Sequence, residues 1–330
     1  MCYDGAMAIL VIGSRTRKED VGISFFLFNE QIGSLTHLGG ISGVDQPTFQ
    51  AFDQRERILY TVSETASGSV SAYRIDDQIQ VELLFTSPSE GDFPCHISIG
   101  PLGELIGVAN YGSGDFTLLS SSGELVCTEH FEGIGFDPVR QEASHIHSSL
   151  WSPDGSYLYV ADLGLDRIIR YSHNRKIKEV IDLPKGVGPR HMAFGRDGLL
   201  YVVGELSSEV LVYRGVVLQQ RISTLPQTFL RENTAADIHL SANGTFLYCS
   251  NRGHDSVAIF QVNQNLRRFE YCFTDKEPRN FTISPDGQWL LVANGSSNTI
   301  TIHRRNTING SVGEITHREA VKEPVCLTWM

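Results

Sequence analysis

The stretch "PRNFTISPDGQWLLVANGSSNTITIHRR" (Pro278–Arg305) contains the pattern that decides the fold. A proline opens a short apolar strand, and the turn sequence "SPDG" (Ser284–Gly287) leads into a second apolar strand, a polar loop and a third strand. Glycine at the end of such a turn supplies the positive φ that a hairpin requires. The stretch therefore predicts antiparallel strands joined by tight turns.

The same layout recurs in five other parts of the chain. The copies begin at Pro47, Pro94, Ile146, Pro189 and Ala235, at intervals of 43 to 52 residues, and the longest interval follows Pro94. A weaker fourth strand, such as Glu124–Phe131 ("ELVCTEHF"), follows the third. About 45 residues and four antiparallel strands per repeat are typical of a β-propeller blade.

The two ends of the chain supply the missing pieces of a seventh copy. The next interval falls on Pro324, so "PVCLTWM" (Pro324–Met330) is the opening strand of a repeat that does not continue. Its remaining strands are expected at Ala8–Ser14 and Gly22–Phe28, because stacked blades must close into a ring without exposed edges. We predict one all-β domain over residues 1–330: a seven-bladed β-propeller with four antiparallel strands per blade, closed by a blade shared between the N- and C-termini. A β-sandwich or two smaller β domains would not explain the even spacing.

Composition limits the partners and the location of the protein. With 41% hydrophobic and 20% charged residues, the chain resembles a soluble globular protein, and no apolar run reaches the ~20 residues that span a membrane. The formal net charge of −11 disfavours nucleic acid and anionic membranes as partners. Ala8–Ile12 is too short for a signal-peptide core, so a cytoplasmic location is expected. Six cysteines without a C-x-x-C pair are interpreted as reduced core residues.

Polar residues recur at equivalent positions of different blades. The start of each first strand and the end of each second strand lie at the same edge of an antiparallel sheet, so these positions are expected around the mouth of the central channel. Arginine suits carboxylate or phosphate groups, and histidine and glutamate are common general bases. Any one of these side chains could instead be structural, and Arg252 could form an ion pair with Asp255 or Glu205. The positions hold Glu64, His96, Tyr111, His147, Arg190, His191, Glu205, Arg252, Arg279 and Asn280.

Other chemistries lack their sequence signals. His145 and His147 are two residues apart, but a strand turns only alternate residues to one face, and no third ligand has a known metal-site spacing. We therefore predict no metal. The chain contains no G-x-S-x-G nucleophile elbow, and "NYGSGD" (Asn110–Asp115) lacks the context of a phosphate-binding loop.

Several motifs resemble the seven-bladed propeller lactonases, a family that includes bacterial 6-phosphogluconolactonase and the cofactor-free 3-carboxymuconate lactonizing enzyme. The resemblance covers essentially the whole chain. The motifs are "VANYGSG" (Val108–Gly114), "HIHSSLWSPDG" (His145–Gly155), "ADLGLDRI" (Ala161–Ile168), "GPRHMAF" (Gly188–Phe194), "ELSSEV" (Glu205–Val210), "SNRGHDS" (Ser250–Ser256) and "PRNF" (Pro278–Phe281).

The resemblance implies a function and a set of site residues. It implies that His147, Arg190, Glu205 and Arg252 are catalytic, and it leaves the other six channel-mouth residues as candidates for substrate binding. The implied reaction is cofactor-free hydrolysis of a sugar lactone, most plainly 6-phospho-D-glucono-1,5-lactone to 6-phosphogluconate in the pentose phosphate pathway. Ser144 and Gly204 depart from the proline and asparagine that the family often has, which leaves the substrate open.

Two other functions stay open at this point. A lactonizing cycloisomerase would use the arginines to bind carboxylates and an acid to protonate carbon, whereas a binding scaffold would need neither acid nor base. Sequence also leaves open whether His147 or Glu205 is the general base, which arginine binds phosphate, and whether the protein is a monomer or a dimer.

Overall fold

The computed structural model describes residues 7–172 and 178–330, and its regular elements there are strands apart from one short 3-10 turn at Gly295–Ser297. These strands form seven four-stranded antiparallel sheets. No helix in the described ranges has the length and apolar character needed to cross a membrane. The predicted repeat starts agree with the structure, since a sheet's innermost strand begins at or within three residues of each one.

The contacts divide the chain into two compact units. The first unit runs through Val44, resumes over Gly195–Val203 and continues from Ser208 to Met330, and the second holds Asp45–Phe194 and Gly204–Ser207. The prediction of a single domain over residues 1–330 stays a prediction.

Three sheets lie within the first unit. In spatial order their strands are β28 (Pro324–Trp329), β1 (Met7–Ser14), β2 (Val21–Asn29) and β3 (Ser34–Ser42); β20 (Thr234–Leu240), β21 (Phe246–Arg252), β22 (Ser256–Val262) and β23 (Leu266–Phe273); and β24 (Pro278–Ile283), β25 (Trp289–Asn294), β26 (Thr299–Arg305) and β27 (Val312–Ala320).

Three more sheets lie within the second unit, and a seventh contains the motif around Arg190. The second unit holds β4 (Gln50–Asp53), β5 (Ile58–Ser63), β6 (Ser69–Ile75) and β7 (Val81–Pro88); β8 (Pro94–Ile99), β9 (Leu105–Asn110), β10 (Asp115–Ser120) and β11 (Leu125–His130); and β12 (Ile146–Trp151), β13 (Tyr157–Asp162), β14 (Arg167–Ser172) and β15 (Lys178–Asp182). The seventh sheet has the order β16 (Pro189–Phe194), β17 (Leu200–Gly204), β18 (Glu209–Arg214) and β19 (Val217–Ser223).

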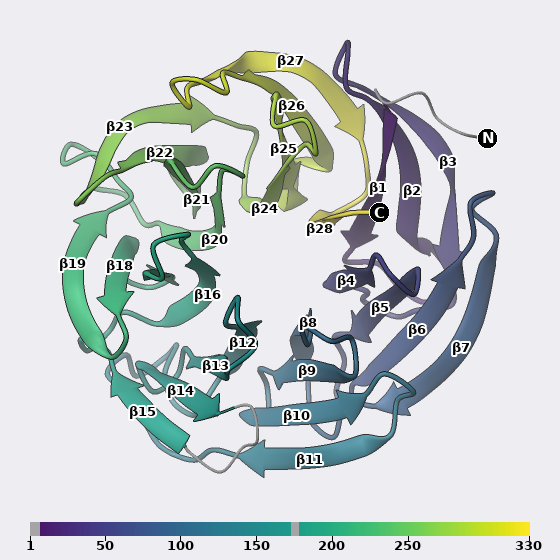
Figure 1. Ribbon diagram of the computed structural model, residues 1–330, viewed down its shortest axis with the longest axis horizontal. Helices are drawn as coiled ribbons and strands as arrows, with labels where there is room; N and C mark the ends of the chain where they lie inside the picture. Colours follow the sequence, from purple (N-terminus) through teal and green to yellow (C-terminus); the bar gives the residue numbers. More distant parts are fainter. Residues whose placement is uncertain (1–6, 173–177) are drawn as a thin grey trace. The chain divides into compact units, whose positions relative to one another are not determined.

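The two ends of the chain share one sheet, as predicted. Strand β28 pairs antiparallel with β1, with Leu327 opposite Ile12 and Trp329 opposite Leu10, and β1 pairs in turn with β2. Figure 1 shows the yellow β28 lying beside the purple β1. Strand β28 therefore pairs with a strand near the other end of the chain, and this pairing accounts for the apolar sequence of β28.

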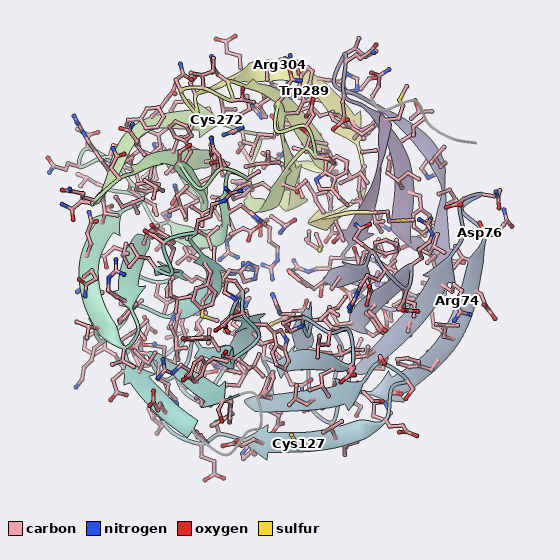
Figure 2. The ribbon with its side chains drawn as sticks, viewed as in Figure 1. Arg74, Asp76, Cys127, Cys272, Trp289 and Arg304 are labelled. Atoms are coloured by element: carbon pink, nitrogen blue, oxygen red, sulfur yellow. The ribbon has the colours of Figure 1, made fainter. Side chains whose placement is uncertain are left out.

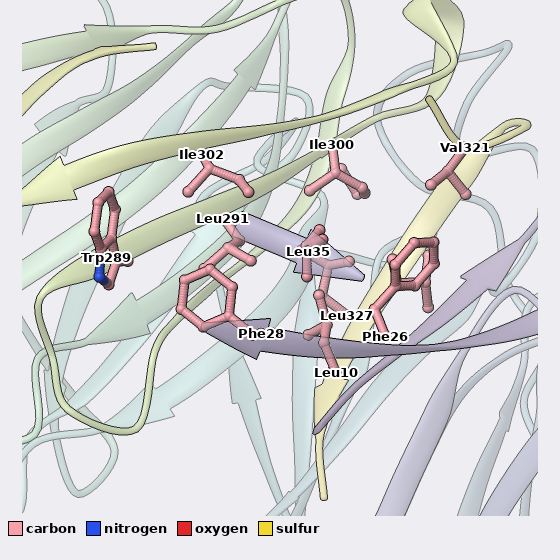
Figure 3. Packing of buried hydrophobic residues seen from close by; sticks show 12 residues of the cluster. Leu10, Phe26, Phe28, Leu35, Trp289, Leu291, Ile300, Ile302, Val321 and Leu327 are labelled. Carbon is pink, nitrogen blue, oxygen red and sulfur yellow. The ribbon is translucent and has the colours of Figure 1, made fainter. Parts of the chain in front are cut away.

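An apolar cluster holds this shared sheet against the sheet of β24 to β27 (Figure 3). Leu10, Phe28 and Leu327 pack there with Leu291 and Ile302, all of them buried. Each such side chain contributes roughly 1.5–3 kcal/mol on burial. The cluster therefore stabilises the attachment of both chain ends.

Trp289 is the largest side chain of that cluster. Its indole Nε1 donates to the Glu30 backbone carbonyl at 2.7 Å, and the Arg304 guanidinium lies 4.6 Å from the ring centroid (Figure 2). The polar end of this large side chain is therefore satisfied while its ring is buried.

The hairpin glycines have the predicted conformation. Gly155, Gly244 and Gly287 have φ of 70°, 75° and 73°. A second left-handed position, absent from the sequence prediction, comes just before the third strand of six sheets, at Ser67, Gly114, Asp166, Ser208, Asp255 and Asn298.

The cysteines match the prediction of reduced thiols. Cys95, Cys249, Cys272 and Cys326 are buried and Cys127 is partly buried, all of them free, whereas Cys2 lies outside the described residues. Burial raises the pKa of the Cys272 thiol to about 12, which keeps it protonated and unreactive.

Candidate active site

Three of the predicted catalytic residues lie together in the second unit. His147 is on β12, Arg190 on β16, and Glu205 directly follows β17. Their exposed fractions are 4%, 3% and 3%, so all three are withdrawn from bulk water. Arg190 Nε lies 3.0 Å from Glu205 Oε2, an ion pair between two buried side chains.

A second arginine, absent from the sequence prediction, contacts the same carboxylate. Arg140 Nη2 donates to Glu205 Oε1 at 2.5 Å, so each oxygen of Glu205 faces a guanidinium group. Burial disfavours the charged form of Arg140, but the attraction of Glu205 and hydrogen bonds with Glu205 and Tyr111 outweigh it and raise its pKa. Burial also raises the pKa of the Tyr111 phenol, although Arg140 opposes that shift. Two cations therefore flank one buried carboxylate.

Imidazole and aromatic rings form a connected group beside these charges. The His147 and His191 ring centroids are 5.5 Å apart, and His191 lies 5.3 Å from His96 in turn. Tyr111 meets His147 edge-on at 5.6 Å. Arg190 Nη1 lies 3.2 Å from His191 Nε2 and 3.5 Å from its Nδ1, so the guanidinium group contacts the imidazole ring.

Neighbouring strands fix the backbone that carries His147 and Arg190. The Cys95 thiol on β8 lies 3.3 Å from the His147 carbonyl oxygen and 3.8 Å from its Nδ1. The Ser148 hydroxyl donates to the Arg190 carbonyl oxygen at 2.5 Å. The site residues therefore lie on strands that are hydrogen-bonded through side chains as well as through their own ladders.

Two buried aspartates of "ADLGLDRI" hold the segments that lead into these strands. Asp162 accepts from the Ser144 hydroxyl at 2.9 Å and the His145 backbone N–H at 3.0 Å, just before β12. Asp166 accepts from the backbone N–H groups of Gly186 at 2.6 Å and Gly188 at 2.7 Å, just before β16. These carboxylates set where His147 and Arg190 begin their strands.

Two glycines allow the close approach of loops in this region. A Cβ at Gly164 would lie 1.9 Å from the Ala143 carbonyl oxygen, so no side chain fits there. A Cβ at Gly204 would lie 2.7 Å from Val187 Cγ1, which accounts for glycine immediately before Glu205.

Comparison with known proteins identifies the family. The family model described as "Lactonase, 7-bladed beta-propeller" matches residues 9–329. The chain belongs to this lactonase family. The predicted seven-bladed β-propeller fold is thereby confirmed, in agreement with the seven four-stranded sheets.

Relatives span nearly the whole length of the chain. A 6-phosphogluconolactonase of Formosa agariphila is 32% identical over 336 residues, covering 93% of this chain and 95% of the relative. A 6-phosphogluconolactonase of Bacillus subtilis is 29% identical over 350 residues, covering 97% of each. The solved structure of the Pseudomonas aeruginosa periplasmic gluconolactonase PpgL has a TM-score of 0.89 at 28% identity, covering 98% of this chain and 99% of that one.

Glu64 of this lactonase has a buried carboxylate oxygen to which a ligand could donate a hydrogen bond. It follows β5 directly, and its Oε2 is buried without a hydrogen-bond partner among the residues that the structure describes. A buried carboxylate oxygen of this kind is costly unless a donor reaches it. Its predicted role in substrate binding remains a prediction that this observation supports.

The remaining predicted site residues of the lactonase belong to the first unit. Arg252, at the end of β21, donates through Nη2 to the Ala235 carbonyl oxygen at 3.2 Å, and Arg279 is half-buried on β24. Asn280 is buried, and its side-chain amide donates to Asp237 at 2.6 Å and accepts from the Leu327 backbone N–H at 2.7 Å. Those bonds give Asn280 a structural task, and its predicted role in substrate binding stays untested.

The His-x-His motif (His145–His147) is the part of the sequence that could suggest a metal site. The His145 side chain contacts Tyr111. Its Nδ1 lies 2.9 Å from the Tyr111 carbonyl oxygen, and the two rings stack with their centroids 4.3 Å apart. Over residues 7–172 and 178–330, no three His, Cys, Asp or Glu side chains are grouped to hold a metal ion.

Arg140 was missed because it lies outside the repeat. It is in the connection from β11 to β12, which no position of the blade pattern describes. The longest interval between repeat starts, from Pro94 to Ile146, was the available signal, because it showed extra residues inserted just before the His-x-His motif.

Proposed function

We propose that the protein hydrolyses a sugar δ-lactone without a cofactor, with 6-phospho-D-glucono-1,5-lactone as substrate and 6-phosphogluconate as product. The observation that carries the proposal is the group of buried His147, Glu205 and Arg190, with the partly exposed Arg140 on the same carboxylate, in a member of the lactonase family. Relatives named 6-phosphogluconolactonase at 29–32% identity support the choice of substrate.

Arg190 is the residue assigned to the developing negative charge. Attack of water on the lactone carbonyl places charge on the carbonyl oxygen, and a fixed donor at that oxygen is worth about 10²–10³ in rate. Arg190 suits this task because contacts with Glu205 and His191 hold its guanidinium in one orientation. It therefore needs no rearrangement during the reaction.

His147 is the residue assigned as general base. Both oxygens of Glu205 face guanidinium groups, which favours a carboxylate that stays charged and orients cations. A neutral imidazole can accept a proton from water, and such a base contributes about 10²–10⁴ in rate. Glu205 is then the residue that fixes Arg190.

An anionic substrate suits the charge of the cluster. Two guanidinium groups against one carboxylate leave a local positive charge in a chain whose formal net charge is −11. Such a site attracts anions over the rest of the surface. The predicted substrate-binding residues of the second unit, Glu64, His96, Tyr111 and His191, are assigned to the phosphate and hydroxyl groups. A phosphorylated sugar substrate agrees with a cytoplasmic location.

Hydrolysis of 6-phosphogluconolactone by the purified protein tests the proposal. His147→Ala and Arg190→Ala are expected to lower kcat/KM at least about 100-fold, and Arg252→Ala tests the second predicted arginine. His317→Ala is the matched control, because His317 is an exposed histidine on β27, and it should stay within about twofold of the wild type. Absence of turnover by the wild-type protein would refute the proposed function. Full activity of His147→Ala and Arg190→Ala would refute the site.

A further inference from the structure

We propose that Arg140 is a positioning residue for this reaction: acting through Glu205, it fixes the orientation of Arg190 from a loop outside the blade pattern. The inference rests on the proposed function, because it names a further residue of the same site. The contacts form one series, from Arg140 Nη2 to Glu205 Oε1 at 2.5 Å, and from Glu205 Oε2 to Arg190 Nε at 3.0 Å.

The loop that carries Arg140 is fixed without the help of its guanidinium group. Gln141 is fully buried, and its side chain donates to the Leu163 carbonyl oxygen at 2.8 Å and accepts from the Asp137 backbone N–H at 2.9 Å. Asp137 accepts in turn from the backbone N–H groups of Val139 and Arg140, both at 2.9 Å. Since these bonds already hold the loop, the Arg140 side chain is available for the site.

The ion pair of Arg140 with Glu205 differs from an ordinary surface ion pair because its carboxylate is buried. The side chain of Arg140 is 39% exposed, whereas those of Glu205 and Arg190 are each 4% exposed. The arginine thus reaches from solvent to a buried carboxylate. Exposed ion pairs contribute little, but a cation that contacts a buried carboxylate is screened much less.

Arg140 also connects Glu205 with Tyr111. Its pKa is raised in part by a hydrogen bond with the Tyr111 phenol, and the Tyr111 ring meets His147 edge-on at 5.6 Å. One planar guanidinium therefore contacts a neighbour of the proposed base and a neighbour of the proposed oxyanion donor. A lysine could replace its charge but not this fork of donors.

Loss of this cation should change how activity depends on pH. Among the described residues, the ionisable groups around Glu205 include Arg140, Arg190 and Tyr111, with His191 beside Arg190. Those around His147 include Cys95, Tyr111 and His191. Removing a positive charge favours the protonated form of both Glu205 and His147. The acid limb of the kcat/KM profile should therefore move to higher pH.

The experiment compares Arg140→Gln and Arg140→Lys with the wild type on 6-phosphogluconolactone. Arg57→Gln is the matched control, because Arg57 is also 39% exposed and pairs with Asp77 in the same unit. We expect kcat of Arg140→Gln to fall about 30–100-fold with KM within about threefold, the pattern of an interaction made in the transition state. Arg140→Lys should recover part of the loss, and Arg57→Gln should match the wild type.

A double substitution separates an effect through Glu205 from general damage. In the Glu205→Gln background, Arg140→Gln should lower kcat by less than about threefold further, because residues in one network are not additive. Additive losses, an unmoved acid limb, or wild-type kcat in Arg140→Gln would each overturn the positioning role while leaving the proposed function standing. If the wild-type protein opened no lactone, both proposals would fall together.

Discussion

Two buried carboxylates, one in each unit, show how differently the same group can be used. Asp237 on β20 and Glu205 after β17 are each 3% exposed. Asp237 accepts hydrogen bonds from the Ile238 backbone N–H at 2.9 Å, the Asn280 amide at 2.6 Å and the Phe281 backbone N–H at 3.2 Å. Glu205 instead faces two guanidinium groups.

The donors decide the role of each carboxylate. Backbone and amide donors at Asp237 tie strands β20 and β24 together, and Asn280 extends the tie to Leu327 on β28. Guanidinium groups at Glu205 bring positive charge into a buried place where a substrate could meet it. We therefore propose that Asp237 stabilises the fold and that Glu205 takes part in the reaction.

The largest expected effect comes from deleting β28, the strand that Asn280 connects to Asp237. Deletion of residues 324–330 removes the partner of β1 and exposes the cluster that Leu327 covers. Four buried residues, Pro324, Val325, Cys326 and Leu327, are lost with it, at roughly 1.5–3 kcal/mol for each large apolar side chain. Thermal unfolding should show Tm lowered by about 10 °C or more.

Removal of Met330 alone is the control for the deletion. It costs one backbone hydrogen bond to the Ile9 carbonyl oxygen, about 1 kcal/mol. An unchanged melting curve after the longer deletion would contradict the role of the shared sheet.

The next effect separates the two carboxylates directly. Glu205→Gln should lower kcat about 10²–10³-fold, because Arg190 loses the partner that orients it. Asp237→Asn should leave kcat within about threefold and lower the free energy of unfolding by about 1–3 kcal/mol, because a buried acceptor is replaced in part by a donor. Steady-state kinetics and urea unfolding of both variants measure the two quantities. Equal losses of kcat in Glu205→Gln and Asp237→Asn would contradict the different roles proposed for the two carboxylates.

The smallest effect concerns His239, whose Nε2 lies 2.9 Å from Asp237 Oδ2. Burial lowers the pKa of this imidazole, but the attraction of Asp237 and their hydrogen bond outweigh it and raise the pKa above its usual value. A raised pKa in the folded state means that the pair stabilises the fold below about pH 6.5 and that this contribution is lost as pH rises through the folded pKa.

The size of that contribution is small because His239 is partly open to solvent. Its side chain is 41% exposed, so we expect less than about 1 kcal/mol. The free energy of unfolding of the wild type minus that of His239→Gln, measured from pH 5 to 9, should decrease as pH rises. If the difference in the free energy of unfolding increased with pH, the pKa of His239 would be lowered rather than raised in the folded protein, which would contradict the prediction.

The fold could be predicted well from the sequence because its four-stranded sheets repeat. Proline stands at five of the seven repeat starts and glycine in five of the six first hairpin turns, so Pro324 could be recognised as the start of an incomplete copy. The same pattern selected Arg190 and Glu205, which form an ion pair, and His147, whose ring contacts His191 beside Arg190; their catalytic roles stay predictions.

What sequence could not supply lies in contacts between non-equivalent segments. Arg140 lies in the connection from β11 to β12, outside the blade pattern, and its contact with Glu205 depends on how Gln141 and Asp137 fold one loop. Asn280 occupies a position that the blade pattern assigned to substrate, yet its amide is used by Asp237 and Leu327. Such partners are set by side-chain geometry rather than by periodicity.

A structure of the protein with 6-phosphogluconate bound would test the central claim most directly. The account predicts the product carboxylate, which derives from the lactone carbonyl, within about 3 Å of the Arg190 guanidinium and beside His147, with Arg140 still on Glu205. A product carboxylate that contacted neither Arg190 nor His147 would contradict it.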